Sequence, residues 1–214
     1  MIDCFAFFRK VFLATASFVL LASIHPAACA ADGSEPAQLP AFETLPAQLP
    51  GEALLKRLAA KSVKGRFQER RTVPGFPKPM VTTGVFEMKG DRLRWEAEKP
   101  FPSVMIASPE GVVMEAAGEK QVLSAADVPA AGRISVLLSS VLSGKFSALN
   151  EMFDVRAQSL PDGGVRMAAR PKSRELGQAL EEVRAEGRNF VERIEVISKQ
   201  GRTEILFLDV VSGS

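Results

Sequence analysis

The sequence of 214 residues predicts a mainly β (α+β) domain, built as a curved antiparallel sheet of about ten to eleven strands with an N-terminal helix and a helical segment in the middle. Short extended runs alternate with turn-forming stretches such as PGFPKP, KGD and KPFP, which end one strand and begin the next. In the clearest run, 92–98, Leu93, Trp95 and Ala97 alternate with charged residues. Strands this short, joined by tight turns, form an antiparallel meander with an apolar inner wall.

The expected strands fall into two groups, one on each side of the helical segment. The first group covers 63–73, 81–88, 92–98, 104–108, 112–116 and 120–123, and the second covers 153–159, 165–170, 180–185, 190–198 and 202–208. In the second run, Gly84, Phe86 and Met88 share one face, which adds to the apolar wall. We therefore expect the function to depend on something held against this wall.

Two segments have the period of a helix. Residues 51–62 place Leu54, Leu55 and Leu58 on one face. Residues 133–144 place apolar side chains at i, i+3, i+4, i+7 and i+8, with serines on the other face and a glycine at the end. These apolar residues are Ile134, Leu137, Leu138, Val141 and Leu142. A serine face suits a helix that is covered part of the time, although an ordinary surface helix explains the same pattern equally well.

The first 30 residues have the pattern of a secretory signal peptide. A basic pair, Arg9 and Lys10, precedes an apolar run of about fourteen residues and a small-residue end, and the run is short for a membrane span. We predict cleavage after Ala30 and export out of the cytoplasm. In the alternative, a lipoprotein, Cys29 would be lipidated, and Pro26 fits that pattern poorly.

The next 20 residues, 31–50, contain PAQLP twice in a Pro/Ala-rich stretch and predict an extended linker. Residues 51–214 then form one domain of ordinary size. The formal net charge of the whole chain is +2, with the basic excess between residues 61 and 100. With one tryptophan and no tyrosine, and with export expected, nucleic acid is not a predicted partner.

The chemistry available after cleavage is limited, because the leader contains both cysteines and the only histidine. Neither G-x-S-x-G nor S-x-x-K occurs, no phosphate loop is complete, and a metal could be bound only by carboxylates. Glu96 and Glu98 could be imagined as a glycosidase pair, but the neighbouring Arg94 and Lys99 favour a salt-bridged outer face. We predict no enzymatic activity and no cofactor.

Several motifs occur in a fixed order after the N-terminal helix. They are G-R-F-Q-E-R at residues 65–70, T-G-x-F at 83–86 and L-R-W-E-x-E-x-P at 93–100, followed by the helical segment and the late strands. With these motifs the chain resembles a divergent branch of the periplasmic outer-membrane lipoprotein carrier family (LolA-like), loosely from residue 51 to about 210. The matching residues are Phe67, Gln68, Glu69, Arg70, Trp95 and Pro100.

This resemblance implies an unclosed antiparallel β-barrel, a half-barrel with a helical lid and an apolar cavity for acyl chains. The expected cavity residues are Phe67, Phe86, Met88, Leu93, Trp95, Met105, Ile106, Met114, Ile205 and Phe207. The lid would be the helix with Ile134, Leu137, Leu138, Val141 and Leu142. Lys89 stands where the family has a lid-contacting arginine, and would be the lid latch. Phe101, between two prolines, is expected to touch a membrane or a partner during transfer.

The resulting hypothesis is a monomeric carrier that takes acylated cargo from an inner-membrane donor to an outer-membrane acceptor, with transient membrane contact. Because Lys89 replaces the arginine and the chain stops at Ser214, just past the last strand, the cargo is either a lipoprotein or a glycolipid. A lipid-sensing regulator on the same half-barrel is the alternative, and it would hold a stable protein partner without transferring cargo. A hydrolase is the third hypothesis.

Overall fold

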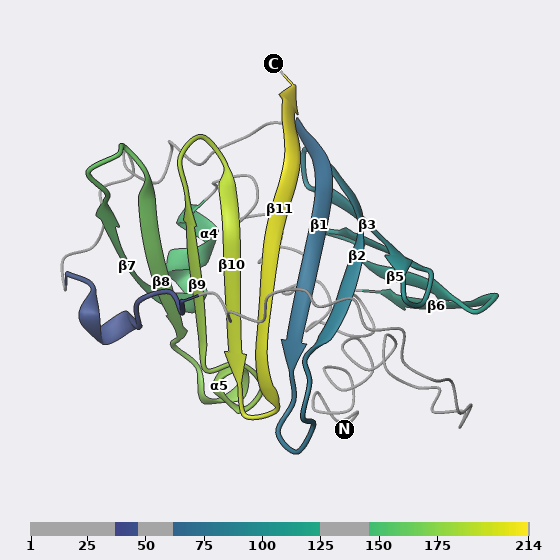
Figure 1. Ribbon diagram of the computed structural model, residues 1–214, viewed down its shortest axis with the longest axis horizontal. Coiled ribbons are helices and arrows are strands. Elements are labelled where there is room, and N and C mark those ends of the chain that lie inside the picture. The colour runs from purple at the N-terminus through teal and green to yellow at the C-terminus, as the bar shows by residue number, and fades with distance from the viewer. Residues whose placement is uncertain (1–36, 47–61, 125–145, 214) are drawn as a thin grey trace.

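In the computed structural model, which describes residues 37–46, 62–124 and 146–213, the strands form one eleven-stranded antiparallel sheet in the order β6-β5-β4-β3-β2-β1-β11-β10-β9-β8-β7 (Figure 1). The strands are β1 (Ser62–Thr72), β2 (Met80–Lys89), β3 (Arg92–Lys99), β4 (Ser103–Ser108), β5 (Gly111–Ala116), β6 (Glu119–Ser124), β7 (Phe153–Ser159), β8 (Val165–Pro171), β9 (Glu182–Gly187), β10 (Val191–Ser198) and β11 (Gly201–Gly213). The predicted mainly β fold is confirmed.

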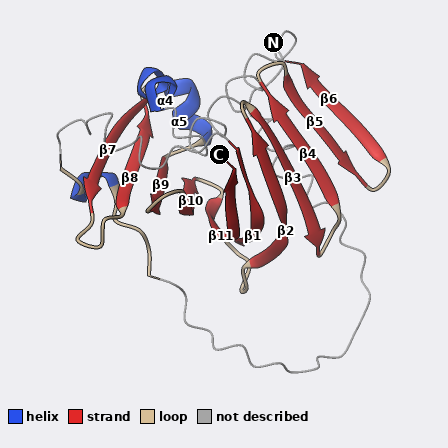
Figure 2. Cartoon of the chain, turned by 90° about the horizontal axis from the view of Figure 1, so that it is seen from above, coloured by secondary structure: helices blue, strands red, loops and turns tan. Residues whose placement is uncertain are grey.

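The sheet is strongly curved but not closed, since β6 and β7 are its two edges. Seen from above it forms an arc, with α4 (Phe146–Met152) and α5 (Arg174–Ala179) on its inner side (Figure 2). We call this inner side the concave face and the opposite side the convex face. Neither of these two short helices, in the part of the chain that the structure describes, has the length and apolar character to cross a membrane.

The two halves of the sheet meet where the first strand pairs with the last. β1 and β11 run antiparallel from the pair Ser62–Gly213 to the pair Thr72–Arg202, with one bulge near Lys64. Because the two ends of the domain are neighbours in the middle of the sheet, β2–β6 and β7–β10 extend from them as two meanders in opposite directions.

The observed strands begin and end within a few residues of the expected ones, except in two places. β9 begins at Glu182 because the residues before it form α5, a helix that the sequence analysis missed. Its start is capped by Ser173, whose hydroxyl oxygen accepts a hydrogen bond from the Leu176 N–H at 3.2 Å. β11 is longer than expected because it pairs along most of β1.

The expected linker is the clearest difference from prediction. Its described part, residues 37–46 with the short helix η1 (Phe42–Thr44), packs against the domain, and Leu39, Phe42 and Leu45 are buried. Phe42 and Leu45 form a small cluster with Ala168. Ala168 lies on the convex face, whereas the residues on either side of it along β8 lie on the concave face. We call residues 37–46 the strap. The leader, most of the helix expected at 51–62 and the lid helix lie outside the described residues.

Candidate functional site

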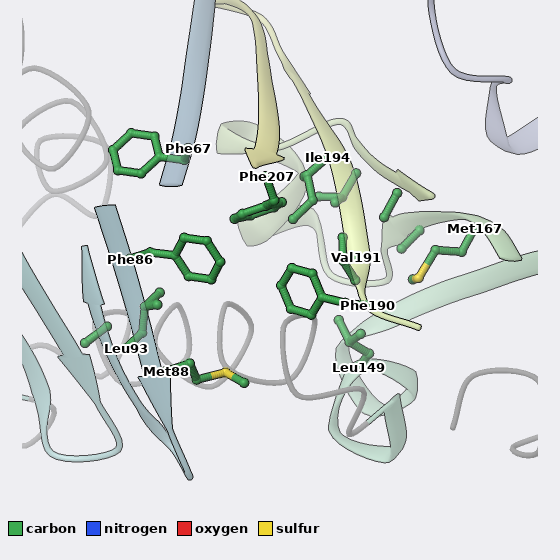
Figure 3. Packing of buried hydrophobic residues seen from close by; sticks show 14 of the residues in the cluster. Phe67, Phe86, Met88, Leu93, Leu149, Met167, Phe190, Val191, Ile194 and Phe207 are labelled. Atoms are coloured by element: carbon green, nitrogen blue, oxygen red, sulfur yellow. The ribbon is translucent and has the colours of Figure 1, made fainter. Parts of the chain in front are cut away.

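Aromatic rings fill the centre of the concave face. The rings belong to Phe67 of β1, Phe86 of β2, Trp95 of β3, Phe207 of β11 and Phe190, the residue before β10. The Phe67 and Trp95 rings stack with centroids 3.8 Å apart, and the Phe207 ring meets Phe86 edge-on at 4.9 Å and Phe190 at 5.5 Å. Figure 3 shows the rings of Phe86, Phe190 and Phe207 converging from separate segments of the chain. Such pairs add to the stability that their burial alone provides.

Two glycines of the sequence motifs make room for these rings. Gly84 pairs with Phe67 across β1 and β2, and a Cβ at Gly84 would lie 2.8 Å from the Phe67 ring and 2.0 Å from the Glu96 carbonyl oxygen. Gly65 pairs with Phe86 in the same way, and a Cβ there would lie 3.1 Å from the Phe86 ring. The glycines therefore allow each ring to lie flat against the neighbouring strand.

Nine of the ten residues expected to line the cavity share the concave face. Of these, Phe67, Phe86, Met88, Leu93, Met114 and Phe207 are buried, and Trp95, Met105 and Ile205 keep some exposure. Ile106 is the exception and a correction: it pairs with Arg94 and Val113 on the convex face, because side chains alternate along β4.

The sequence analysis missed part of this face. Phe190 comes just before β10, and Leu149 of α4 and Leu176 of α5 pack onto the same cluster as the rings. Phe190 was expected at the start of a strand, but nothing in the strand pattern showed that its ring would meet Phe86 from the other meander. The lid residues Ile134, Leu137, Leu138, Val141 and Leu142 lie outside the described residues.

One end of the concave face is polar. Glu69 follows Phe67 on the same side of β1 and pairs with Thr82 on β2 and Ile205 on β11. Burial raises the pKa of the Glu69 carboxyl, and the nearby Arg71 guanidinium acts in the opposite direction. Arg71 occupies the next position on this side of β1, opposite the buried Thr203.

Lys89, the expected latch, and Phe101, the expected membrane-contact residue, lie at opposite ends of the sheet. Lys89, at the end of β2, makes an ion pair with Glu87 at 2.8 Å, and both alternate with Met88, so they lie on the convex side of β2. A side chain that holds a lid over the concave face was expected on the concave side instead. Phe101, in the β3–β4 turn, is 53% exposed, and Phe76, in the β1–β2 turn at the same end of the sheet, is 65% exposed.

A family model described as outer membrane lipoprotein carrier protein LolA matches residues 59–213. The chain belongs to the LolA family. Similar solved structures are a LolA superfamily protein from Nitrosomonas europaea (8% identity, TM-score 0.40, covering 78% of this chain and 95% of that one) and an outer membrane lipoprotein-sorting protein domain from Vibrio parahaemolyticus (7%, 0.40, 77% and 92%). A third is a DUF1329 family protein from Desulfovibrio piger (10%, 0.39, 75% and 91%).

Membership of the family rests on the family match over residues 59–213. No curated protein matches the chain. The strap precedes the matched region.

The strap is held on the convex face by buried charged side chains. The Glu195 carboxylate accepts hydrogen bonds from the Leu39 N–H at 2.9 Å and from Arg193 and Arg202 at 2.8 Å each. Glu195 is fully buried, so these donors replace its water shell. The Arg193 guanidinium also donates to the Ala37 carbonyl at 2.7 Å.

Glu182 holds the second point of the strap. Burial alone would raise the pKa of its carboxyl, but hydrogen bonds from Arg184, the Phe42 N–H and Arg170 hold that pKa below its usual range. The guanidinium groups of Arg156 and Arg170 both lie over the Phe42 ring, 4.2 and 4.9 Å from its centroid. The Glu182 and Glu195 carboxylates therefore accept hydrogen bonds from backbone N–H groups of the strap and from arginine side chains. Within the described ranges, no three acidic, histidine or cysteine side chains form a group that could hold a metal.

Proposed function

We propose that this protein binds acyl chains of a lipoprotein, or of another lipid-anchored molecule, on its concave face and carries them through the periplasm toward the outer membrane. Membership of the LolA family supports a carrier, since its model is described as an outer membrane lipoprotein carrier. The proposed action is binding and release, without a chemical step. It implies a membrane-bound donor and acceptor and a monomer in solution.

The physical need for such a carrier follows from the cost of exposing hydrocarbon to water. Each methylene group left in water costs about 0.8 kcal/mol, so a chain of sixteen carbons costs on the order of 12 kcal/mol. A lipid-anchored molecule crosses an aqueous compartment at a useful rate only if a host covers its chains. Aromatic and methionine side chains suit this purpose, because methionine adapts to cargo of irregular shape.

The observation that carries the proposal is the partial exposure of Trp95 and Met105 beside the buried apolar cluster of the concave face. The two residues pair directly across β3 and β4, and Met105 also pairs with Met114. Large apolar side chains that keep exposure beside a buried cluster offer a surface that a hydrocarbon chain could cover.

The test is the binding of a fluorescent acyl probe to the Leu93→Glu and Ile106→Glu variants. Leu93 faces the buried cluster, where an unpaired carboxylate is strongly disfavoured, so we expect at least a tenfold loss of probe affinity. Ile106 is the matched control, because it lies on the adjacent strand but on the convex face, and its variant should bind as the unaltered protein does.

Circular dichroism must show that both variants fold. If Leu93→Glu does not fold, Trp95→Ala replaces it, since Trp95 is partly exposed and its loss removes contact area without burying a charge. Equal probe affinity in a folded concave-face variant and in the Ile106 control would contradict acyl binding on this face.

Membrane contact during transfer is the second part of the proposal, and we assign it to the turns that carry Phe76 and Phe101. Both rings are exposed at the same end of the sheet, and the exposed Lys78 and Lys99 lie close to them in the sequence. Lysine beside exposed aromatic side chains is suited to an anionic lipid surface. Inserting one phenyl ring contributes about 2 kcal/mol, which permits a brief encounter and not a stable anchor.

We expect Phe101→Ser and Phe76→Ser to lower association with liposomes that contain anionic lipid, together by more than tenfold, with little change in the melting temperature. Val122→Ser is the matched control, because Val122 is 62% exposed on the edge strand β6, away from these turns. A drop of several degrees in melting temperature with unaltered association would mean that the rings pack within the protein.

A further inference from the structure

The concave face changes character along the strand direction. At one end, Val63, Met88 and Leu93 lie side by side on β1, β2 and β3, and all are buried and apolar. The pairs that follow on β1 and β2 are Gly65 with Phe86 and then Phe67 with Gly84, which belong to the aromatic cluster. The end of the concave face at Val63, Met88 and Leu93 therefore offers only apolar contacts to a bound molecule.

The next two positions on this side of β1 are polar. Glu69 pairs with Thr82 and Ile205, and Arg71 pairs with Met80 and Thr203. Along β1, therefore, two apolar positions and a glycine are followed by a carboxyl group and a guanidinium group on the same face. The polar positions are those closer to the β1–β2 and β3–β4 turns, where Phe76 and Phe101 are exposed.

Glu69 is an unusual residue for a structural role at this position. It lies next to the Phe67–Trp95 stack, and burial raises the pKa of its carboxyl. In contrast with Glu182 and Glu195, no hydrogen bond to the Glu69 carboxylate is seen among the described residues; the charged group that acts on it is Arg71, on its own strand. A carboxyl group kept in a partly apolar site at such a cost is typical of functional sites.

We propose that Glu69 receives a hydrogen-bond-donating group of the cargo, an ammonium or a hydroxyl close to the acyl chains. This proposal rests on the proposed function and specifies how the cargo lies: its hydrocarbon toward Met88 and Leu93, and its polar part toward Glu69 and the exposed turns. An anionic group beside Glu69 is repelled by its carboxylate, and the nearby Arg71 offsets part of that repulsion, so discrimination against an anion depends on Glu69. The polar part of the cargo is then nearest the end of the sheet that we assign to membrane contact.

The experiment measures how three amphiphiles with the same twelve-carbon chain displace a fluorescent acyl probe from the protein. Dodecylamine, dodecanol and laurate differ only in the polar group. We expect the unaltered protein to bind dodecylamine and dodecanol about tenfold more tightly than laurate. Glu69→Gln keeps a hydrogen-bond acceptor but removes the charge and the repulsion of laurate, so it should bind dodecylamine more weakly, dodecanol about as before and laurate more tightly. Glu69→Leu keeps no acceptor, so it should bind both the amine and the alcohol more weakly.

Glu192→Gln is the matched control, since Glu192 is exposed on β10 and its variant should keep the preferences of the unaltered protein. If the Glu69 variants rank the three amphiphiles as the unaltered protein does, Glu69 does not select the polar group, while acyl binding itself stands. If none of the amphiphiles displaces the probe from any of these proteins, the proposed function fails and this inference fails with it.

Discussion

Gly84 shows how a single position shapes the concave face. The Phe67 ring lies against the backbone of β2 at Gly84 and stacks on Trp95 of the following strand. Any side chain at Gly84 would displace that ring and collide with the Glu96 carbonyl oxygen, which is backbone and cannot move aside. The glycines of the two motifs are thus explained by the rings on the adjacent strands, and not by turns.

We expect Gly84→Ala to destabilise the protein by about 1–3 kcal/mol, the usual range for overpacking a well-filled core. Urea denaturation followed by circular dichroism measures this loss. Gly177→Ala is the control: no atom lies within 4 Å of a Cβ placed at Gly177, which is in the helix α5, so this change should be neutral or stabilising by up to about 1 kcal/mol. Equal effects at both positions would show that the ring does not need the space.

Glu69 and Glu182 are expected to respond oppositely to the same substitution. Burial raises the pKa of the Glu69 carboxyl, so ionising it lowers the stability of the folded protein. This loss of stability is absent below the unfolded pKa near 4.5 and grows as pH rises through the folded pKa. Glu69→Gln should therefore raise the melting temperature at pH 7, and this gain should disappear in acid.

The strap is the element that the sequence analysis described least well. Proline and alanine predicted an extended linker, but the burial of Leu39, Phe42 and Leu45 depends on charged residues far away in the chain, such as Glu182 and Glu195. On β9 and β10 those residues look like an ordinary exposed face. Their pairing with the strap backbone is a long-range contact that no local pattern reveals.

We expect Glu182→Gln to loosen the strap and lower the free energy of unfolding at pH 7 by about 1–3 kcal/mol, since buried donors lose a charged acceptor. Glu182 has a lowered pKa, so its contribution is present above the unfolded value near 4.5 and is lost as pH falls through the folded pKa. The difference between variant and unaltered protein should therefore shrink in acid. Thermal unfolding at several pH values checks this, and a constant difference would contradict the assigned role.

The helix α5 was missed for a local reason. Its sequence, RELGQA, is short and contains a glycine, so its apolar periodicity is too brief to be detected. The Ser173 cap is a signal that could have located it. Ile106 was misassigned because adjacent residues of a strand face opposite sides, and its neighbour on β4, Met105, lies on the concave face. Lys89 lies on the convex side of β2 for the same reason, and its role as a latch stays a prediction.

At the scale of the whole molecule, the strands and the open sheet were predictable because turn residues and period-two alternation are local signals. The pairing of β1 with β11 and the meeting of Phe86 with Phe190 were not, because they join segments distant in the sequence. Nine apolar residues that lie on the concave face were predicted, from alternation and from the family resemblance. The polar end at Glu69 became visible only once the strand register was known.

The central claim, that acyl chains bind on the concave face, can be measured through Trp95. It is the only tryptophan in a chain without tyrosine, and it lies partly exposed among the rings of that face, so its fluorescence reports on this site alone. An acyl chain brominated at its middle should quench Trp95 in a saturable manner, while the unbrominated chain of the same length should not. Saturable binding of the brominated chain, measured by calorimetry, without quenching of Trp95 would contradict the claim.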